Sequence, residues 1–406
     1  MNEQLVVKNF GPIKDATVDF KRVTVFIGPT GGGKSTLAKL AAVFRQFSSF
    51  LSKEEGLRRR MNSLGIENYF SETSSIEWLA FPARMRFENG NWTVGFHNVV
   101  RTEQQKAQQL IYELQKEINS LKELVEKNGR PSDFDNQVAD IEGKRLIVED
   151  FIKNHAAPKQ PQYLPAERIL LAILGDNWPD LISEKSSLPS ALLLFAKGFL
   201  NARKEIEHLP LVGIDAHYQH SEDRDRIVLG NGKTLMLSET ASGIQSVTPL
   251  LVLLEHLSRN TEQAQSFIIE EPELNLYPTA QQGLLNWLVE KCTKGENDLT
   301  ITTHSPYVLS ALNLALYANK VATQFPHQSK KVAKLIPEKC WLKAEEFSAY
   351  FVAKGTAKSI FNTKTGLLSE SQLDEVSGEF ADIFDRLTDL RVPEKKTPAK
   401  AKSAKK

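Results

Sequence analysis

A lysine inside a run of glycines has the clearest chemistry of any residue in this chain. Lys34 lies in the stretch Gly-Pro-Thr-Gly-Gly-Gly-Lys-Ser, residues 28–35, which fits the pattern G-x-x-x-x-G-K-[ST]. The glycines let the backbone curl so that its N–H groups face phosphate oxygens, and a following helix adds its positive N-terminal end. Lys34 can then reach the β and γ phosphates of ATP, and the hydroxyl of Ser35 can bind Mg²⁺. The residues predicted to contact the nucleotide in this phosphate loop are Gly28, Pro29, Thr30, Gly31, Gly32, Gly33, Lys34, Ser35 and Thr36.

Two adjacent carboxylates follow a short apolar run at residues 266–269. Such a run is typical of a buried parallel strand, and open α/β sheets bind their ligands at the carboxyl ends of their strands. Successive side chains of a strand point in opposite directions, so the two acids can have different roles. We predict that Glu270 helps to hold Mg²⁺ and that Glu271 polarises the attacking water as a catalytic base. The alternative, a solvated acidic turn before Pro272, is disfavoured by the presence of a phosphate loop.

Two further stretches carry candidate site residues. His304 follows the β-branched run at residues 299–303, and a histidine at a strand end beside a nucleotide can contact the γ phosphate or position water. Ser242 and Gly243 precede the apolar run at residues 247–254, which predicts a helix with a hydroxyl and an open backbone at its N-terminus. An ordinary helix cap is the alternative for that stretch.

Regular elements must position these residues. The apolar run at 23–27 predicts a strand before the phosphate loop, and residues 36–44 predict a helix after it. Turn signals at Asn89-Gly90 and Asn231-Gly232 predict two β-hairpins, and residues 168–210 predict the helices of a second lobe. The three arginines at 58–60 are best explained by a solvated helix face, with DNA contact as the minority alternative.

The segment from residue 101 to 157 has a different character, with two charged helical patterns around residues 128–131. In the first, apolar residues recur at spacings of three and four: Ile111, Leu114, Ile118, Leu121 and Val125. The second follows nearly the same rule, with Arg145 interrupting it: Phe134, Val138, Ile141, Val148 and Ile152. This predicts a short antiparallel coiled-coil insertion with arms on the order of 35 Å. It could recruit a partner or close over DNA, and a purely structural insertion is at least as well supported.

Taken together, these motifs resemble the ABC-type ATPase heads of the structural-maintenance-of-chromosomes, RecF and OLD group, and most closely the short bacterial ATPases of phage-defence systems. Four matches carry the resemblance: residues 9–13 (Asn-Phe-Gly-Pro-Ile), residues 241–245 (Ala-Ser-Gly-Ile-Gln) as the signature, residues 270–273 (Glu-Glu-Pro-Glu) as the Walker B strand, and residues 303–305 (Thr-His-Ser). The resemblance covers about residues 1–50 and 160–390.

The resemblance implies an α/β fold: an ABC-type head of the P-loop NTPase class, with a mixed sheet and a helical lobe. Residues 1–100 and 158–391 would form the head, 101–157 the insertion and 392–406 a disordered basic tail. Two heads would enclose two ATP–Mg²⁺, with Ser242, Gly243 and Gln245 of one chain contacting the nucleotide bound by the other. Lys34, Glu271 and His304 would then be the catalytic residues.

Three features depart from the family pattern. Glu270 stands where most ABC proteins have Asp, and the signature lacks the double glycine. No glutamine-loop residue can be assigned: Gln160 and Gln162 are equally compatible with a functional and a structural role. Arg168 is the better candidate, for contact with phosphate or with an interface.

Composition limits the class of protein. The 406 residues are 41% apolar and carry a formal charge of +1, of which residues 393–406 hold six Lys and one Glu, so the body is not basic. Two cysteines and a start without a signal-peptide pattern favour a reducing cytoplasm, and no apolar run approaches the ~20 residues that span a bilayer. We therefore expect a cytoplasmic protein without a membrane partner.

The expected output is regulation of a separately encoded effector, such as a nuclease, in anti-phage defence. No cluster after His304 matches the metal-binding acids of a nuclease module, and Asp382, Asp385 and Asp389 have the helical spacing of an exposed face. The alternatives are a RecF-like DNA clamp and an assembly scaffold that binds ATP with little turnover, and a transporter subunit is the least favoured.

Overall fold

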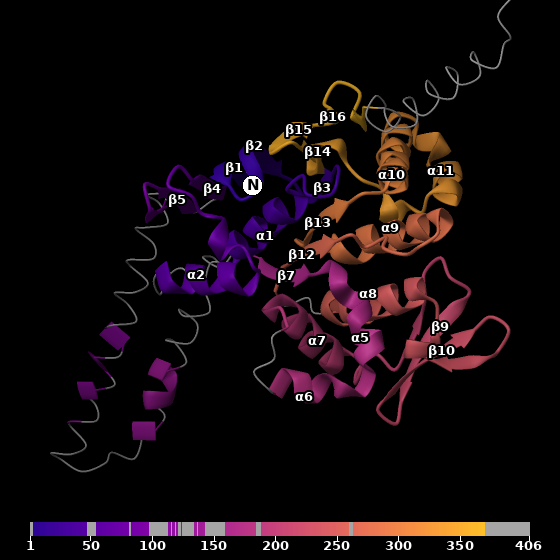
Figure 1. Ribbon diagram of the computed structural model, residues 1–406, viewed down its shortest axis with the longest axis horizontal. Helices are drawn as coiled ribbons and strands as arrows, with labels where there is room; N and C mark the ends of the chain where they lie inside the picture. Colours follow the sequence, from indigo (N-terminus) through magenta and orange to yellow (C-terminus); the bar gives the residue numbers. More distant parts are fainter. Residues whose placement is uncertain are drawn as a thin grey trace, which may run out of the picture.

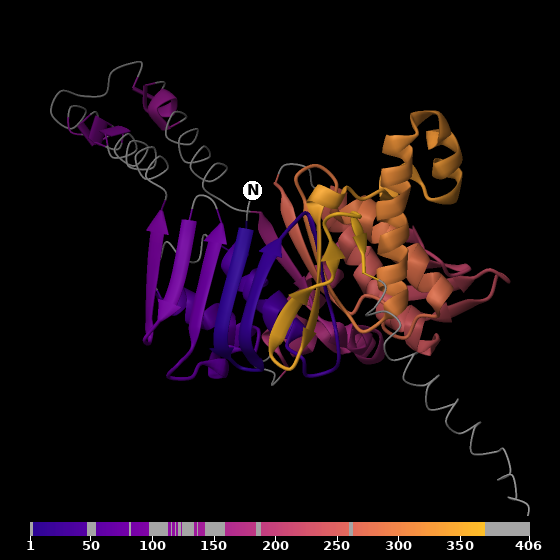
Figure 2. The same ribbon diagram turned by 90° about the horizontal axis from the view of Figure 1, so that it is seen from above.

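The computed structural model describes residues 3–46, 54–80, 83–96, 159–183, 188–259 and 263–369, with scattered positions between 113 and 142. One mixed sheet of eleven strands dominates this part of the chain, in the order β6-β5-β4-β1-β2-β15-β14-β3-β13-β12-β7. Figure 2 shows the sheet running from the N-terminal strands at one end to the later strands at the other. The sheet therefore combines the two ends of the described chain in a single layer.

Five neighbouring strands of the sheet are parallel, and they carry the site. They are β7 (Gln160–Leu164), β12 (Gln265–Glu270), β13 (Asp298–Thr303), β3 (Val23–Ile27) and β14 (Phe347–Ala353). The register pairs Thr303 with Ile27 and Glu270 with Thr302, so the strands end together. We call this border of the sheet the carboxyl edge. The predicted strands at 23–27, 266–269 and 299–303 are confirmed.

The other strands are mainly antiparallel. They are β1 (Glu3–Phe10), β2 (Ile13–Phe20), β4 (Ser75–Ala80), β5 (Ala83–Glu88), β6 (Asn91–Phe96) and β15 (Thr356–Ser359). β5 and β6 form the predicted hairpin, and Asn89 and Gly90 both have positive φ, 52° and 79°. Two positive φ angles are what a tight hairpin turn of matching twist requires.

Helices cover both faces of the parallel strands (Figure 1). The packing follows the alternation of strand side chains: Phe26 faces the helices α1 (Lys34–Arg45) and α2 (Glu54–Ser63), whereas its neighbour Val25 faces the opposite core. That opposite core is covered by α8 (Ser242–Arg259), α9 (Pro278–Cys292) and α10 (Pro306–Gln324). Burial on both faces explains why β12 and β13 are buried at every position.

A second lobe follows β7, as predicted for residues 168–210. It contains the helices α5 (Ile169–Leu174), α6 (Trp178–Ser183) and α7 (Ser190–Ala202) and a small sheet of β8 (His208–Pro210), β9 (Ala216–Ser221), β10 (Arg224–Leu229) and β11 (Thr234–Met236). β10 and β11 form the predicted hairpin at Asn231-Gly232. The remaining elements are α11 (Ser329–Leu335), β16 (Phe361–Asn362), β17 (Leu367–Leu368) and the 3-10 turns at Glu67–Tyr69, Ala166–Arg168, Gly175–Asn177, Leu237–Glu239, Pro326–Gln328, Glu338–Cys340 and Ala344–Glu346.

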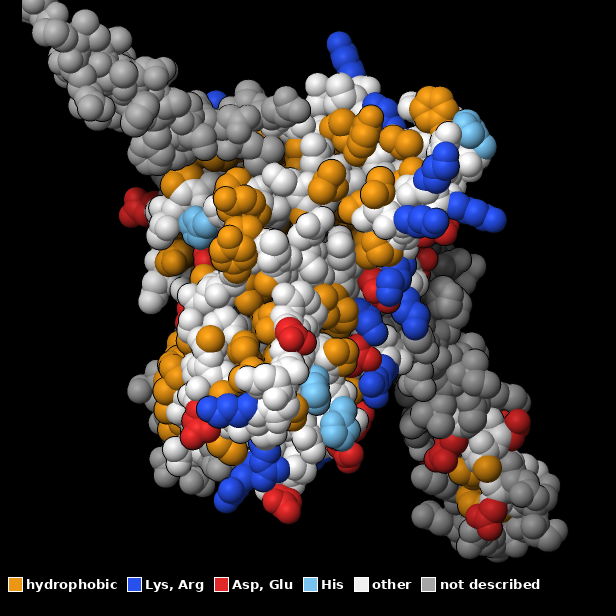
Figure 3. Space-filling view, turned by 90° about the vertical axis from the view of Figure 1, so that its right-hand side faces the viewer, with side chains coloured by type: hydrophobic (Ala, Val, Ile, Leu, Met, Phe, Trp, Pro, Cys, Tyr) orange, Lys and Arg blue, Asp and Glu red, His pale blue; other side chains and the backbone are white. Residues whose placement is uncertain are grey.

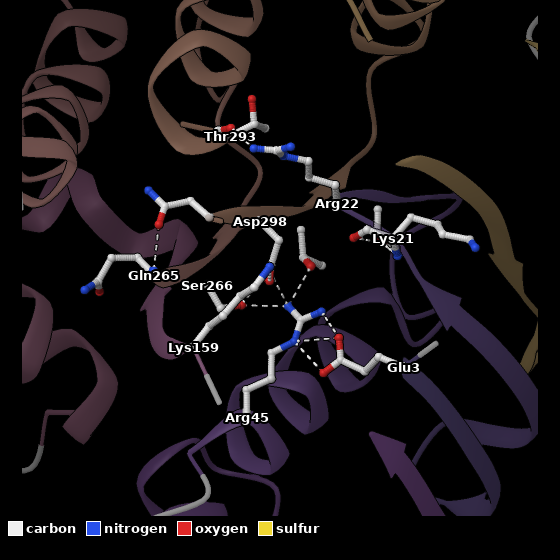
Figure 4. Close-up of polar contacts among 12 residues, drawn as sticks. Glu3, Lys21, Arg22, Arg45, Lys159, Gln265, Ser266, Thr293 and Asp298 are labelled. Carbon is white, nitrogen blue, oxygen red and sulfur yellow. Dashed lines mark hydrogen bonds and ion pairs between the residues drawn. The ribbon is translucent and has the colours of Figure 1, made fainter. Parts of the chain in front are cut away.

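A buried arginine in the last turn of α1, Arg45, contacts the border of the sheet opposite the carboxyl edge, where β12 and β13 begin (Figure 4). Arg45 is only 3% exposed, and its Nε donates to Glu3 at 2.9 Å while its Nη1 donates to Asp298 at 3.0 Å and to Ser266 at 2.7 Å. Lys159 Nζ lies 3.0 Å from the other oxygen of Asp298. Although burial disfavours the charged form, the two carboxylates raise the pKa of Arg45 above its usual range. These five residues form the Arg45 cluster.

Most of the predicted insertion lies outside the described residues. The described positions from 113 to 142 are helical, and Leu114 and Ile141, one from each predicted stripe, are buried together. The basic tail and Asp382, Asp385 and Asp389 also lie outside the described residues. Among the helices that the structure describes, none has the length and apolar character that crossing a membrane requires.

Candidate functional site

The phosphate loop connects β3 to α1 and is shaped by the strand beside it. Gly28 and Gly33 have φ values of 147° and 107°, which L side chains rarely adopt. A Cβ atom on Gly28 or on Gly32 would overlap the carbonyl oxygen of Val352 in β14. Only glycine allows this close approach. Helix α1 begins at Lys34 without a side-chain cap, so its first backbone N–H groups are available to an anion.

The turn at residues 9–13 supports the loop from the other side. Asn9 and Gly11 have positive φ, 49° and 53°, and they turn the chain from β1 into β2. The turn brings Ile13 against the loop, where its side chain occupies the space that a Cβ atom on Gly33 would need. The motif at residues 9–13 therefore has a packing role beneath the phosphate loop.

Lys34 lies between the loop and the acidic strand. Its side chain is 4% exposed, and its Nζ donates to the carbonyl oxygens of Gly28 at 2.9 Å and Pro29 at 3.1 Å. The same Nζ lies 3.1 Å from Nε2 of His304. Burial lowers the pKa of Lys34, and the neighbouring glutamates, Glu271 foremost, oppose that shift. The ammonium is thus held at the carboxyl edge by groups on both sides.

Glu270 is the last residue of β12 and is 6% exposed. Burial raises the pKa of Glu270, and the neighbouring hydroxyls of Tyr163 and Ser35 oppose that shift. Its Oε1 is buried and has no hydrogen-bond partner among the residues that the structure describes. A buried carboxylate oxygen without a partner, next to a serine hydroxyl, fits the oxygen ligands that Mg²⁺ takes in phosphate-binding sites.

Glu271, the next residue, is more exposed to solvent than Glu270. Its φ is 41°, and its backbone N–H donates to the carbonyl of Thr302 at 2.9 Å. Its Oε1 lies 3.0 Å from Nε2 of His304. If Nε2 carries the proton that Glu271 accepts, Nδ1 is left as an acceptor, 3.4 Å from the ammonium of Lys34. The structure therefore brings Lys34, His304 and Glu271 together, as the sequence predicted.

Arg168 has a different role from the one expected. Its side chain is 0% exposed, and it donates to the carbonyl oxygens of Glu270 at 2.6 Å and Glu271 at 2.8 Å. Burial lowers the pKa of Arg168 to about 10, against the opposing effect of the surrounding glutamates. A buried side chain that holds two backbone carbonyls reaches neither a phosphate nor an interface. Arg168 instead fixes the backbone at the end of the acidic strand.

Neither candidate for the glutamine loop lies at the carboxyl edge. Gln160 is the first residue of β7 and pairs with Gln265, the first residue of β12. Gln162 donates from its amide to the side-chain oxygen of Gln265 at 2.9 Å. Both glutamines belong to the amino-terminal part of β7, and they support the sheet there.

The signature stretch lies at the N-terminus of α8, which begins at Ser242. Ser242 is exposed and Gly243 is buried, where a Cβ atom would lie 2.6 Å from the carbonyl oxygen of Asn275. Gln245 donates from its amide to the carbonyls of Ser238 and Thr240, both at 2.8 Å, so its side chain holds the preceding turn. Among the contacts of the described residues, none joins this stretch to the phosphate loop.

Two polar side chains near the site were not singled out from the sequence. Glu273 accepts from the backbone N–H of His304 at 3.1 Å and from the hydroxyl of Thr303. Gln281, in α9, accepts from the hydroxyl of Ser305 at 2.6 Å. The third acid of Glu-Glu-Pro-Glu was a visible signal for Glu273, whereas Gln281 has no sequence signal because its partner lies on another helix.

A phosphate loop between a parallel strand and a helix, with acidic and histidine residues on the neighbouring strand ends, defines a nucleotide-binding protein of the P-loop class. The family model described as "AAA ATPase domain" matches residues 66–309, more than half of the chain, and the protein belongs to this family. The matched region includes the signature stretch, the acidic strand and His304, and begins after the phosphate loop.

No curated protein matches the sequence. Solved structures that resemble this chain were found. One is an Smc head domain with an extended coiled coil from Pyrococcus furiosus, bound to the C-terminal domain of ScpA: 9% identity, TM-score 0.39, covering 94% of this chain and 99% of that one. Another is the recombination mediator RecF with a nucleotide, at 12% identity and TM-score 0.31, covering 89% and 98%. A third is an Smc head domain from Pyrococcus yayanosii, at 8% identity and TM-score 0.39, covering 93% and 99%.

Proposed function

We propose that this chain is a Mg²⁺-dependent ATPase whose catalytic groups are Lys34, Glu271 and His304. The observation that carries the proposal is the set of contacts at the carboxyl edge. Nε2 of His304 lies 3.1 Å from the Lys34 ammonium and 3.0 Å from the Glu271 carboxylate, at the N-terminus of an uncapped helix. Positive groups thus surround the place for the phosphates, and a carboxylate faces the place for water.

The side chains divide the work by position. Lys34 and the backbone N–H groups of the phosphate loop neutralise and orient the β and γ phosphates. Ser35 and Glu270 would hold Mg²⁺, which supplies further charge neutralisation when it is bound. Glu271 orients the attacking water and accepts its proton, and His304 holds that carboxylate in place while it faces the γ phosphate. Positioning and electrostatics supply most of the rate in phosphoryl transfer.

The test is Glu271→Gln, which removes the base while keeping the size of the side chain. We expect the variant to bind ATP and to lose about 10²- to 10⁴-fold in kcat, the usual contribution of a general base. Turnover is measured by phosphate release, and binding by a fluorescent ATP analogue. Equal turnover of variant and wild type would show that Glu271 is not the catalytic base. Full biological activity of a variant without turnover would favour the scaffold alternative.

Dimerisation around ATP is the second part of the proposal. Ser242 is exposed at the start of α8, and its hydroxyl is available to a nucleotide on another molecule. The resemblance to ABC-type heads supports a head-to-tail dimer in which Ser242 and Gly243 complete the partner's site. The measurement is the molecular mass in solution with and without ATP. Glu271→Gln should accumulate as a dimer with ATP, and adding Ser242→Arg to it should keep the protein monomeric.

Control of a separately encoded effector in anti-phage defence is the proposed output, and the Glu-Glu-Pro-Glu motif supports it. A surface on α10 and α11 supports a protein partner: residues 306–335 contain four Lys and neither Asp nor Glu. Five exposed large apolar side chains lie there: Tyr307, Leu314, Tyr317, Phe325 and Leu335. Hydrophobic and basic side chains occur together on this side of the molecule in Figure 3. An apolar surface with a basic rim fits an acidic protein surface.

The partner is tested by copurification from cells that express the neighbouring reading frames. We expect a nuclease-type effector to be retained, and the variant Lys330→Glu/Lys331→Glu/Lys334→Glu to lose it while keeping ATPase activity. Loss of the effector in a matched triple exchange of exposed lysines elsewhere would contradict this surface. Salt-sensitive, ATP-dependent binding of the isolated protein to duplex DNA would instead favour the RecF-like clamp.

A further inference from the structure

The loop after the acidic strand, residues 271–276, is held in an unusual conformation. Glu271 and Asn275 both have positive φ, 41° and 61°, although neither is glycine. Positive φ is uncommon for residues other than glycine, and it persists where the surrounding structure fixes it. Within the loop, the N–H of Leu276 donates to the carbonyl of Glu273 at 3.0 Å. These backbone angles and this hydrogen bond therefore give the loop one specific conformation.

The carboxylate of Glu273 joins this loop to the turn that carries His304. Glu273 is 7% exposed, and its Oε1 accepts from the N–H of His304 at 3.1 Å and from the hydroxyl of Thr303. The same Thr303 hydroxyl accepts from the N–H of Ser305 at 2.9 Å. One carboxylate oxygen thus organises three consecutive residues at the end of β13.

A second contact joins the same two segments. Gln281 is 8% exposed, and its amide donates to the carbonyl of Leu276 at 2.9 Å while its oxygen accepts from Ser305 at 2.6 Å. Glu273 and Gln281 therefore act on either side of His304, and each links the turn to the loop. Since Glu271 begins that loop, its distance from His304 depends on both links.

We propose that Glu273 is a positioning residue for the reaction proposed above: it holds His304 by its backbone N–H so that the imidazole stays between Lys34 and Glu271. The contact with the backbone leaves both ring nitrogens free for catalytic partners. Gln281 is the weaker second support, because it acts on Ser305 rather than on His304 itself. This inference rests on the proposed ATPase function and adds a residue to it.

A direct role for Glu273 in binding nucleotide is less consistent with its surroundings. One oxygen, Oε1, is occupied by Thr303 and His304, and the other, Oε2, is buried and has no hydrogen-bond partner among the described residues. Among the described residues, the hydrogen bonds of the Glu273 carboxylate join it to the end of β13 and the residue after it, and none joins it to the phosphate loop. Its removal should therefore change the rate of hydrolysis more than the affinity for ATP.

The experiment compares Glu273→Ala and Glu273→Gln in the full chain, with and without His304→Ala. We expect Glu273→Ala to lower kcat by about 10- to 100-fold, as loss of a supporting contact does elsewhere, with KM changed by less than about 3-fold. Glu273→Gln keeps an acceptor oxygen and should retain at least about a third of kcat. In the His304→Ala background, Glu273→Ala should cost less than about 3-fold, because the two residues act as a unit.

Several results would overturn the inference. An unchanged kcat in Glu273→Ala, an equal loss in the His304→Ala background, or a Glu273→Gln variant as impaired as Glu273→Ala would each do so. If Glu273→Ala does not fold, the comparison is made with Gln281→Ala, for which we expect a loss of about 3- to 10-fold that also disappears without His304. A wild type without turnover would refute the proposed function itself, whereas turnover lost in Glu271→Gln but kept in Glu273→Ala would refute this inference alone.

Discussion

The two borders of the parallel sheet both bury charged side chains, but they differ in whether those side chains have hydrogen-bond partners. In the Arg45 cluster, every charge has an oppositely charged neighbour: Arg45 contacts Glu3 and Asp298, and Lys159 contacts Asp298 again. At the carboxyl edge, three buried atoms have no hydrogen-bond partner in the described part of the chain: Glu270 Oε1, Glu273 Oε2 and Arg168 Nε. Within the described part of the chain, no side-chain atom of the Arg45 cluster is in that condition.

The Arg45 cluster pairs its charges, whereas the carboxyl edge, among the described residues, leaves an atom of three charged side chains unpaired. Of these three, Glu270 is the one proposed above to hold Mg²⁺. A buried ion pair that is fully hydrogen-bonded is costly to break, because removal of one partner leaves the other charged and buried. A buried carboxylate oxygen without a partner already destabilises the folded protein, because it has lost its contact with water and gained no hydrogen bond in return. Among the described residues, both buried carboxylate oxygens without a partner, Glu270 Oε1 and Glu273 Oε2, lie at the border where the phosphate loop, Glu271 and His304 also lie.

The largest effect on stability is expected for Arg45→Met, in the Arg45 cluster. The exchange keeps much of the side-chain volume and leaves Glu3 and Asp298 without their shared cation, so the free energy of unfolding should fall by about 3–5 kcal/mol. Chemical denaturation followed by circular dichroism measures the change. At low temperature, where the variant is folded, its kcat should match that of the wild type. A stable Arg45→Met variant with impaired turnover would show that the Arg45 cluster serves the reaction rather than the stability of the fold.

Glu270→Gln, at the carboxyl edge, is expected to stabilise the protein, whereas Arg45→Met destabilises it. The exchange removes a buried charge whose pKa is raised by burial, while its amide can still bond the hydroxyls of Tyr163 and Ser35. The free energy of unfolding should rise by about 1 kcal/mol, and Mg²⁺-dependent hydrolysis should be lost. Thermal unfolding and phosphate release measure the two effects. A destabilised Glu270→Gln protein would show that this carboxylate serves the fold.

The smallest effect is expected for Lys159→Met. Its side chain is 31% exposed, and Asp298 keeps its contacts with Arg45 and Ser266 when the lysine is lost. Such a pair contributes about 0.5 kcal/mol, and the change should shrink further at high salt. Denaturation at two ionic strengths measures it. A loss as large as that of Arg45→Met would mean that Lys159 is an equal member of the cluster.

The parts of the site that depend on local pattern could be predicted from the sequence. The phosphate loop, the strand ends at Glu270 and Thr303, and the helix that begins at Ser242 all follow from apolar runs bounded by small or polar residues. The meeting of Lys34, His304 and Glu271 followed from one further rule, that parallel strands end at the same border.

The contacts that depend on strand order could not be predicted in this way. Arg168 holds backbone carbonyls about a hundred positions away, and backbone acceptors leave no trace in the sequence. The pairing of Glu273 with His304 requires β13 to lie between β3 and β12, and nothing in either strand specifies that order. The Arg45 cluster was missed for the same reason, since its members come from five separate segments of the chain.

The carbonyl of Val352, against which Gly28 and Gly32 pack, has a consequence for biosynthesis. The ribosome produces the phosphate loop early, but both neighbours of β3 in the sheet, β13 and β14, are made only in the last third of the chain. Contacts between segments so distant in sequence form slowly, because the intervening chain must first be ordered. A nascent chain stalled before β14 thus carries the complete phosphate-binding motif without the strand that shapes it.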